Sequence, residues 1–116
     1  MRKRNAGRKF ARTMDQRNAF LNSLVRNFLI HGKIRTTEAR AKEIRPIVEK
    51  MITRARVASL ANTRILSKVL APSLTKKLVT EIAPAYKDRK GGYTRITKIG
   101  LRKTDAALMV MFELVK

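Results

Sequence analysis

The side chains that most often carry out catalysis are few in this sequence and lie far apart. The chain has one histidine, His31, eight acidic residues and no cysteine. No carboxylate pair has the spacing of a general acid and base with a supporting partner. The pair Gly91-Gly92 matches neither common phosphate-binding loop, and no cluster of metal ligands is visible. The sequence therefore predicts no catalytic residue, no metal site, no cofactor and no small-molecule substrate.

Positive charge is the chemistry that this sequence supplies in quantity. Twenty-eight Lys and Arg stand against eight Asp and Glu, so the 116 residues carry a formal net charge of +20. Such an excess destabilises a compact chain by self-repulsion unless a polyanion neutralises it. Nucleic acid is the first candidate polyanion, and an anionic membrane surface is the second.

The first cationic segment is the opening stretch MRKRNAGRKFAR. It has one aromatic residue and no periodic apolar face, so we expect an extended tail that neutralises phosphates along a groove. Its arginines favour this interpretation, because their planar guanidinium groups bind phosphate oxygens bidentately. A solubilising arm without a fixed partner and a mitochondrial transit peptide are the alternatives. The predicted contacts are Arg2, Lys3, Arg4, Arg8, Lys9, Arg12 and, in the helix that follows, Arg17.

The second cationic segment is KDRKGGYTRITK. Its two glycines allow a sharp turn and a close backbone approach to a surface. Its tyrosine offers a ring for stacking on a base or ribose, although a tyrosine that closes the core is the alternative. The predicted contacts are Lys87, Arg89, Lys90, Gly91, Gly92, Tyr93, Arg95 and Lys98.

Apolar periodicity predicts about four helices to hold these segments. The first covers residues 13–32, with Thr13 or Asp15 as its cap and Gly32 at its end. The second follows Thr36 or Thr37, and it either kinks at Pro46 or begins there. Two short helices are expected within 59–71 and 73–84, the first stopping before Pro72, the second capped by Ser73 and stopped by Pro84.

The last third of the sequence predicts strands instead. Residues 93–101 and 107–115 should form an antiparallel hairpin, with Leu108, Val110, Phe112 and Leu114 on one face. A short strand near Ile34 is a candidate third partner. We therefore expect an α+β fold in which a small antiparallel sheet packs against about four helices. The basic tail would cover residues 1–12, and a single globular domain residues 13–116.

Three segments in the same order resemble the bacterial large-subunit ribosomal protein seventeen family: MRKRNAGRKFAR, LVRNFLIHGKIRTTEARAKEIRPIVEKMITRAR and RKGGYTRITKIG. The resemblance covers essentially the whole length. It implies a structural, non-enzymatic component of the large subunit that binds large-subunit rRNA beside neighbouring ribosomal proteins, near the rim of the nascent-chain exit tunnel. Lys3, Asp15 and Gly32 depart from residues usual in that family.

These observations predict a protein that binds large-subunit rRNA through the tail and the Gly-Gly-Tyr loop, with specificity from RNA shape rather than a base code. Its expected location is the cytoplasm, on the ribosome of a bacterium or of an organelle. A nucleoid-type protein that coats DNA and a membrane-active cationic protein are the rival classes.

Overall fold

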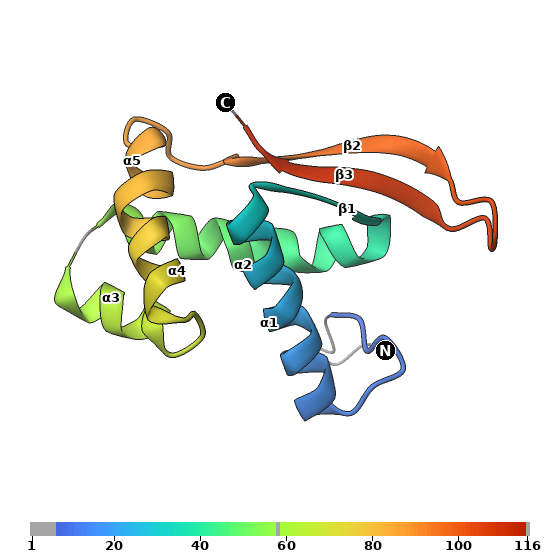
Figure 1. The fold of residues 1–116 in the computed structure, drawn as a ribbon, viewed down its shortest axis with the longest axis horizontal. Helices are drawn as coiled ribbons and strands as arrows, with labels where there is room; N and C mark the ends of the chain where they lie inside the picture. The colour runs from blue at the N-terminus through green and yellow to red at the C-terminus, as the bar shows by residue number, and fades with distance from the viewer. Residues whose placement is uncertain (1–6, 58, 116) are drawn as a thin grey trace, which may run out of the picture.

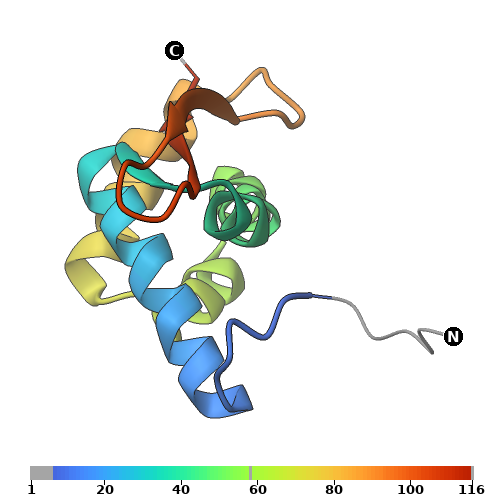
Figure 2. The same cartoon turned by 90° about the vertical axis from the view of Figure 1, so that its right-hand side faces the viewer.

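A layer of helices lies against one side of a three-stranded antiparallel sheet (Figures 1 and 2). The computed structural model describes residues 7–57 and 59–115. The helices and the antiparallel sheet confirm the expected α+β fold. The elements, in chain order, are α1 (Met14–His31), β1 (Lys33–Thr37), α2 (Glu38–Arg56), α3 (Leu60–Ser67), α4 (Pro72–Lys77), a π-helical turn (Leu78–Ile82), α5 (Ala83–Ala85), β2 (Thr94–Leu101) and β3 (Leu108–Leu114).

Both ends of α1 are fixed by local sequence. Thr13, rather than Asp15, is the cap: its hydroxyl accepts from the amide of Gln16, whose side chain accepts from the Thr13 amide. This reciprocal pair is a capping box. At the other end Gly32 takes a left-handed φ of 77° and donates its N–H to the carbonyl of Phe28 at 2.7 Å. The predicted helix is confirmed.

The long helix α2 passes through Pro46 without ending. Its cap is Thr37, whose hydroxyl accepts from the amide of Arg40. A helix beginning at Pro46 was therefore the wrong alternative, and the kink there stays a prediction. The missing backbone bond is tolerated because Ile44 and Val48, on either side of the proline, are fully buried.

The two short helices differ from their predicted bounds at the prolines. The third helix ends at Ser67, earlier than expected. Pro72 then opens the fourth helix at its first position, and Ser73 is not a cap, because Ala71 holds that place without a side-chain bond. Proline suits a first helical position, since the amide that it lacks would have no partner there.

Pro84 does not stop the last helical segment. The chain widens into the π-helical turn just before it, where the amide of Ala83 donates to the carbonyl of Leu78, five residues back. In an ordinary α-helix the Pro84 ring would crowd the carbonyl of Thr80. The wider turn relieves this crowding, so the helical path continues to Ala85.

The sheet has the order β1-β3-β2, with both neighbouring pairs antiparallel. The expected hairpin and the third strand near Ile34 are both confirmed. In the register, Phe112 lies between Ile34 and Ile96, and all three face the helices. A β-bulge between Lys98 and Gly100 interrupts the pairing of β2 with β3.

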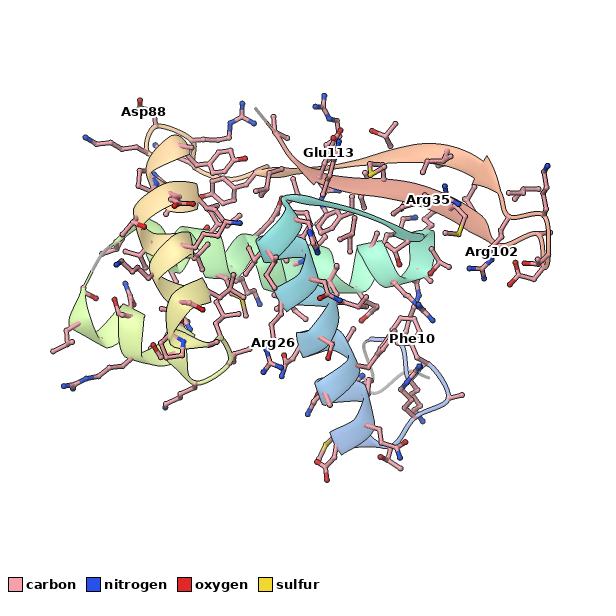
Figure 3. All side chains as sticks on the ribbon, in the orientation of Figure 1. Phe10, Arg26, Arg35, Asp88, Arg102 and Glu113 are labelled. Atoms are coloured by element: carbon pink, nitrogen blue, oxygen red, sulfur yellow. The ribbon has the colours of Figure 1, made fainter. Side chains whose placement is uncertain are left out.

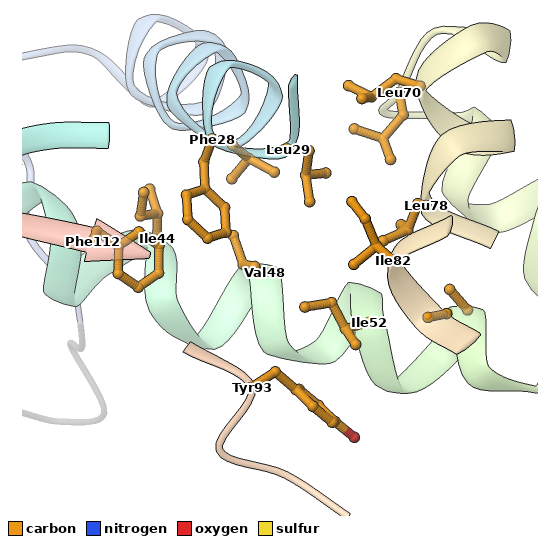
Figure 4. Close-up of a cluster of buried hydrophobic side chains, with 14 of the residues drawn as sticks. Phe28, Leu29, Ile44, Val48, Ile52, Leu70, Leu78, Ile82, Tyr93 and Phe112 are labelled. Atoms are coloured by element: carbon orange, nitrogen blue, oxygen red, sulfur yellow. The ribbon is translucent and has the colours of Figure 1, made fainter. Parts of the chain in front are cut away.

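One hydrophobic core joins the sheet to the helices (Figure 4). The rings of Phe28 from α1 and Phe112 from β3 stack with centroids 4.4 Å apart. Val48 and Ile52 of α2 are fully buried beside them. The apolar face predicted for β3 thus meets buried side chains of α1 and α2 in the core.

The turn between β2 and β3 is held by an ion pair at its tip (Figure 3). Arg102 donates from Nε and Nη2 to the two carboxylate oxygens of Asp105, at 2.9 and 2.7 Å. The amide of Ala107 donates to the same carboxylate at 3.2 Å. The Arg102 hydrogen bond, followed by that from Ala107, lowers the pKa of Asp105 to about 2.

We predict that Gly32→Ala lowers the free energy of unfolding by about 1–2 kcal/mol, because a β-carbon disfavours a left-handed φ. A β-carbon at Gly32 would meet no atom within 4 Å, so the loss comes from the backbone alone. Urea denaturation followed by circular dichroism measures it. The control is Gly91→Ala, at a glycine with equally open space and no left-handed φ, and equal losses in both variants would contradict this assignment.

We also predict that the Asp105 carboxyl titrates near pH 2 in the folded chain and at a higher pH, closer to its ordinary value, in Arg102→Gln, which keeps the hydrogen bond from Ala107. Because the pKa is lower in the folded state, the stabilising contribution of the carboxylate is complete above the unfolded pKa. It is lost as the pH falls toward about 2. Carboxyl chemical shifts measured by NMR across this range test the assignment. Identical titration curves in the two proteins would show that Arg102 does not hold the carboxylate.

Candidate nucleic-acid interface

The described part of the tail, residues 7–12, lies against the helices instead of remaining free of them. Arg8 donates from Nη1 to the carbonyl of Ala39 in α2 at 2.8 Å. Arg17 of α1 donates from Nη1 to the carbonyl of Arg8 at 3.3 Å. Arg17, predicted as a contact beside the tail, thus bonds to the tail itself, and the expected tail contacts α1 and α2 in its described part. Of the predicted contacts, Arg2, Lys3 and Arg4 lie outside the described residues.

An aromatic contact explains why this segment docks. The ring of Phe10 meets the ring of Phe20 in α1 edge to face, with centroids 5.5 Å apart. The guanidinium carbons of Arg12 and Arg40 lie 4.0 and 4.9 Å from the Phe20 ring centroid. Phe10 and Ala11 take left-handed φ values of 52° and 54°, a turn that brings the Phe10 ring to the helix. Phe10 is thus an anchor, and Lys9 and Arg12 stay exposed.

Tyr93 closes the core and does not offer its ring to a base. The side chain is completely buried, and its ring lies 5.3 Å from that of Tyr86. Its hydroxyl accepts from Nη1 of Arg56 at 3.0 Å and shares a hydrogen bond with Thr53 at 3.1 Å. The stacking role predicted for Tyr93 is therefore corrected to its alternative: one face of the ring meets apolar atoms, and the hydroxyl is satisfied inside the protein.

Arg56 ties the loop between α5 and β2 to α2 at two points. While Nη1 holds Tyr93 at the end of the loop, Nη2 donates to the carbonyl of Lys87 at its start, at 2.9 Å. Both acceptors are uncharged, and Nε of Arg56 is buried without a partner among the described residues. The loop is consequently fixed at both ends while its middle projects from α2.

The loop between α5 and β2 has the exposed cations and the open glycine backbone that the sequence predicted. Lys87, Arg89 and Lys90 are exposed, and Nη1 of Arg89 donates to the carbonyl of Gly92 at 3.2 Å. Gly92 has a left-handed φ of 64°, a conformation that favours glycine. No atom lies within 4 Å of where a β-carbon of Gly91 or Gly92 would stand. A phosphate can therefore approach the loop backbone closely.

Arg95 and Lys98 do not join this loop. Arg95 lies on the outer face of the sheet, where Nε is 3.3 Å from a carboxylate oxygen of Glu113. Lys98 lies on the opposite face of β2, in register with Val110, where its charge helps to lower the pKa of Glu38 after the stronger effect of the Lys42 hydrogen bond. Residues three apart on a strand point to opposite faces, so one binding surface could not contain both.

The exposed side of α2 connects the tail to the loop. Figure 2 shows the tail, α2 and the loop after α5 on the same side of the molecule, with α4 on the other side. Lys42 and Arg45 pair with Glu38 and Glu49 one turn away, at 2.8 and 3.7 Å. In the described part of the chain, Lys50 and Arg54 make no such pair. The tail, the exposed face of α2 and the loop after α5 together form one side of the molecule, which we call the basic side.

A groove runs between α2 and the loop on the basic side. Its volume is about 680 Å³. Lys50, Arg54 and Lys90 bring three cations to it, and Glu49 brings one carboxylate. That carboxylate already accepts from the Thr94 hydroxyl at 3.0 Å and pairs with Arg45. The charged side chains that line the groove are therefore mostly cationic, which suits a phosphate backbone.

The family model described as Ribosomal protein L17 matches residues 20–115. The chain belongs to the ribosomal protein L17 family. It is 55% identical over 109 residues to the large ribosomal subunit protein bL17 of Thermoanaerobacter sp. (strain X514), which covers 93% of this chain and 97% of that protein. It is 53% identical over 109 residues to bL17 of Clostridium botulinum (strain Hall), which covers 93% and 96%. The resemblance seen in the sequence is confirmed, and the family consists of structural, non-enzymatic proteins of the large ribosomal subunit.

Within residues 7–57 and 59–115, no helix is long and apolar enough to cross a bilayer. The same residues contain no group of three His, Asp or Glu side chains placed to hold a metal ion.

Two residues of the groove in this L17-family chain, Lys50 and Arg54, were not among the contacts predicted from the sequence. The signal was present, because the two residues are four apart and so share one helix face. That face lies opposite the buried stripe through Ile44, Val48 and Ile52. Phe10 had a weaker signal, since only the fold reveals that Phe20 stands within its reach.

We predict that Tyr93→Phe lowers the free energy of unfolding by about 1–2 kcal/mol, because Nη1 of Arg56 loses its acceptor in a part-buried position. Urea denaturation measures the loss. The comparison variant is Thr53→Val, which removes the other hydrogen bond of the same hydroxyl from an exposed residue and should cost less. If the two variants were equally stable, the Arg56 bond would not be what holds the loop.

Proposed function

We propose that this chain is a structural constituent of the large ribosomal subunit and that its basic side binds large-subunit rRNA. The single observation that supports this most strongly is the continuity of that side from Arg8 through Lys50 to Lys90. The family supports the large subunit as the assembly. Neighbouring ribosomal proteins complete the set of partners, and the resemblance favours a position near the rim of the nascent-chain exit tunnel.

Binding on the basic side would act on phosphates and backbone shape. The aromatic ring expected to stack on a base is buried, so the loop contributes charge and its glycine amides instead. Cationic side chains on a flexible stem and a preformed loop suit the phosphates of a folded RNA, where shape supplies specificity. The proposed contacts are Arg2, Lys3, Arg4, Arg8, Lys9, Arg12, Lys42, Arg45, Lys50, Arg54, Lys87, Arg89, Lys90, Gly91 and Gly92.

The remaining predicted residues take other roles in this proposal. Tyr93 and Arg56 position the loop, and Arg17 positions the tail. Lys98 faces the start of α2 near Glu38, and it could reach an RNA strand that passes the tail. Arg95 belongs to the outer face of the sheet and is not part of the basic side.

The membrane-active alternative has less apolar surface than it needs. It requires the face of α1 that carries Phe20, Leu24 and Phe28 to insert into a bilayer, but Phe28 is completely buried and the other two are half-buried against the core. The bacterial sources of the two relatives support a bacterial ribosome in the cytoplasm as the location. The DNA-coating alternative is left as an outcome of the binding experiment.

We predict that Lys50→Gln and Lys90→Gln each weaken binding to a folded large-subunit rRNA fragment by about 2–10-fold at ~0.1 M salt, because each removes one phosphate contact. The control is Lys76→Gln, an exposed lysine of α4 on the other side of the molecule. Each groove variant should also reduce the slope of log K against log salt by about one. Filter binding at ~50–200 mM salt measures both quantities.

If Lys50→Gln, Lys90→Gln and the control Lys76→Gln bound the RNA with equal affinity, the basic side would not be the interface. Tighter binding of the unmodified chain to duplex DNA of equal length, at matched salt, would favour the DNA-coating alternative instead.

Deleting residues 1–12 tests the tail. We expect a loss of rRNA affinity larger than that of either single variant, because six cations disappear together. The thermal transition should fall only slightly, since Phe10 is half-buried and the core residues remain. Binding and circular dichroism measurements on the same sample distinguish these effects. Unchanged affinity would show that the tail does not contact RNA.

A further inference from the structure

The sheet has an outer face that no described element covers. In Figures 1 and 2 the helices lie on one side of the sheet only. Val110 and Phe112 of β3 point to that side and are completely buried. Because side chains alternate along a strand, the residues between them point outward. By the strand register, the outer face consists of Lys33, Arg35 and Thr37 of β1, Met109, Met111 and Glu113 of β3, and Arg95, Thr97 and Gly100 of β2.

This outer face has an apolar centre and a polar border. Met109 and Met111 lie half-buried on the central strand. Met111 stands in register between Arg35 on one edge strand and Thr97 on the other. Two methionines side by side on a surface form an adaptable apolar contact area. An apolar centre with a charged border is the usual composition of a protein–protein interface.

The charges on the border favour an acidic partner. Lys33 and Arg35 are exposed on β1 (Arg35 and Glu113 are labelled in Figure 3), and no salt bridge of either is found among the described residues. Across the sheet, Arg95 is paired with Glu113 at 3.3 Å. The outer face therefore carries three cations on its two edge strands and one carboxylate on its central strand, and the two cations that form no salt bridge lie on β1.

We propose that the outer face docks a second, different protein, which places apolar side chains on Met109 and Met111 and carboxylates against Lys33 and Arg35. This inference goes beyond rRNA binding, and it rests on the proposed function only because the RNA brings the two proteins together.

RNA fits the outer face less well than a protein does. The face has no aromatic side chain on which a base could stack. Glu113, on the central strand, would repel a phosphate placed across the strands. A nucleic acid would also leave the methionines without apolar contacts, whereas a protein surface covers them.

A second copy of this chain fits poorly as well. Two such faces would bring like charges together, with Arg35 of each near the cations of the other. Three strands about 4.8 Å apart and five to eight residues long offer roughly 300 Å², below the ~800 Å² per partner of a stable interface. A partner already held on the same RNA needs no such area, since its effective concentration is high.

Photo-crosslinking inside assembled large subunits tests this proposal. Met111 is replaced by benzoylphenylalanine in the full chain, and the subunits are purified, irradiated and treated with ribonuclease. We expect one discrete protein adduct, mapped by mass spectrometry to a segment with acidic residues. Thr97, exposed on the same face, carries a second probe in case the replacement of Met111 disturbs folding. Adducts to RNA alone, or no adduct at both positions, would overturn the proposal.

A probe at Lys50 on the basic side separates this inference from the proposed function. An RNA adduct at Lys50 without a protein adduct at Met111 or Thr97 rejects the docking surface alone. A chain that assembles into subunits but gives no RNA adduct at Lys50 counts against the basic side instead.

The charge argument has a separate test. Arg35→Glu should reduce the yield of the protein adduct at Thr97 at least severalfold, and Arg35→Gln should reduce it less, because reversal repels an acidic partner and neutralisation does not. Equal yields in the unmodified chain and in Arg35→Glu would overturn the acidic character of the partner. The thermal transitions of both variants confirm that the exposed substitution leaves the fold intact.

Discussion

The rest of the structure depends on the burial of one side of α2. Its apolar stripe contacts α1, all three strands and the helical segment that ends in α5. Ile44, Val48 and Ile52 on this stripe are completely buried, which stabilises the helix through Pro46. The opposite side of the same helix carries Lys50 and Arg54 between the tail and the loop. One helix thus supplies the core and aligns the two cationic segments, so a rotation of α2 would disturb both.

The cations of this chain have two different roles, and net charge alone does not distinguish them. Arg26 donates two hydrogen bonds to the carbonyl of Val69, at 3.2 and 2.8 Å, and Lys77 donates to that of Ile30 at 2.7 Å. Arg56 likewise donates to the carbonyl of Lys87. These three side chains donate to backbone carbonyls of the protein, and they thereby fix one element or loop to another. The +20 total therefore overstates the number of phosphates that the protein can neutralise.

Sequence reasoning identified the elements more accurately than the roles of single residues. Apolar periodicity located α1, α2 and β3 and their buried faces, because burial of such a stripe is the main source of their stability. It failed where long-range contacts decide. Tyr93, for example, lies beside Arg56 and Thr53, which are about 40 residues away in the chain. It also failed at Pro84 for a local reason, because the widened turn before this proline lets the helix continue. The contact of the tail with α1 was not expected, because the sequence does not show that Phe20 lies near Phe10.

The proposed RNA binding would also affect the stability of the folded protein, through Arg56 and the tail. The two hydrogen bonds of Arg56 go to uncharged oxygens, and its Nε has no partner among the described residues, so its charge is not cancelled inside the protein. Phe10 and Ala11 hold left-handed φ values, which cost of order 1–3 kcal/mol each. Phosphates beside the loop and the tail would stabilise these charges and offset this backbone strain. A ligand that binds only the folded state raises its stability, so the same contacts that place the protein on RNA would also complete its fold.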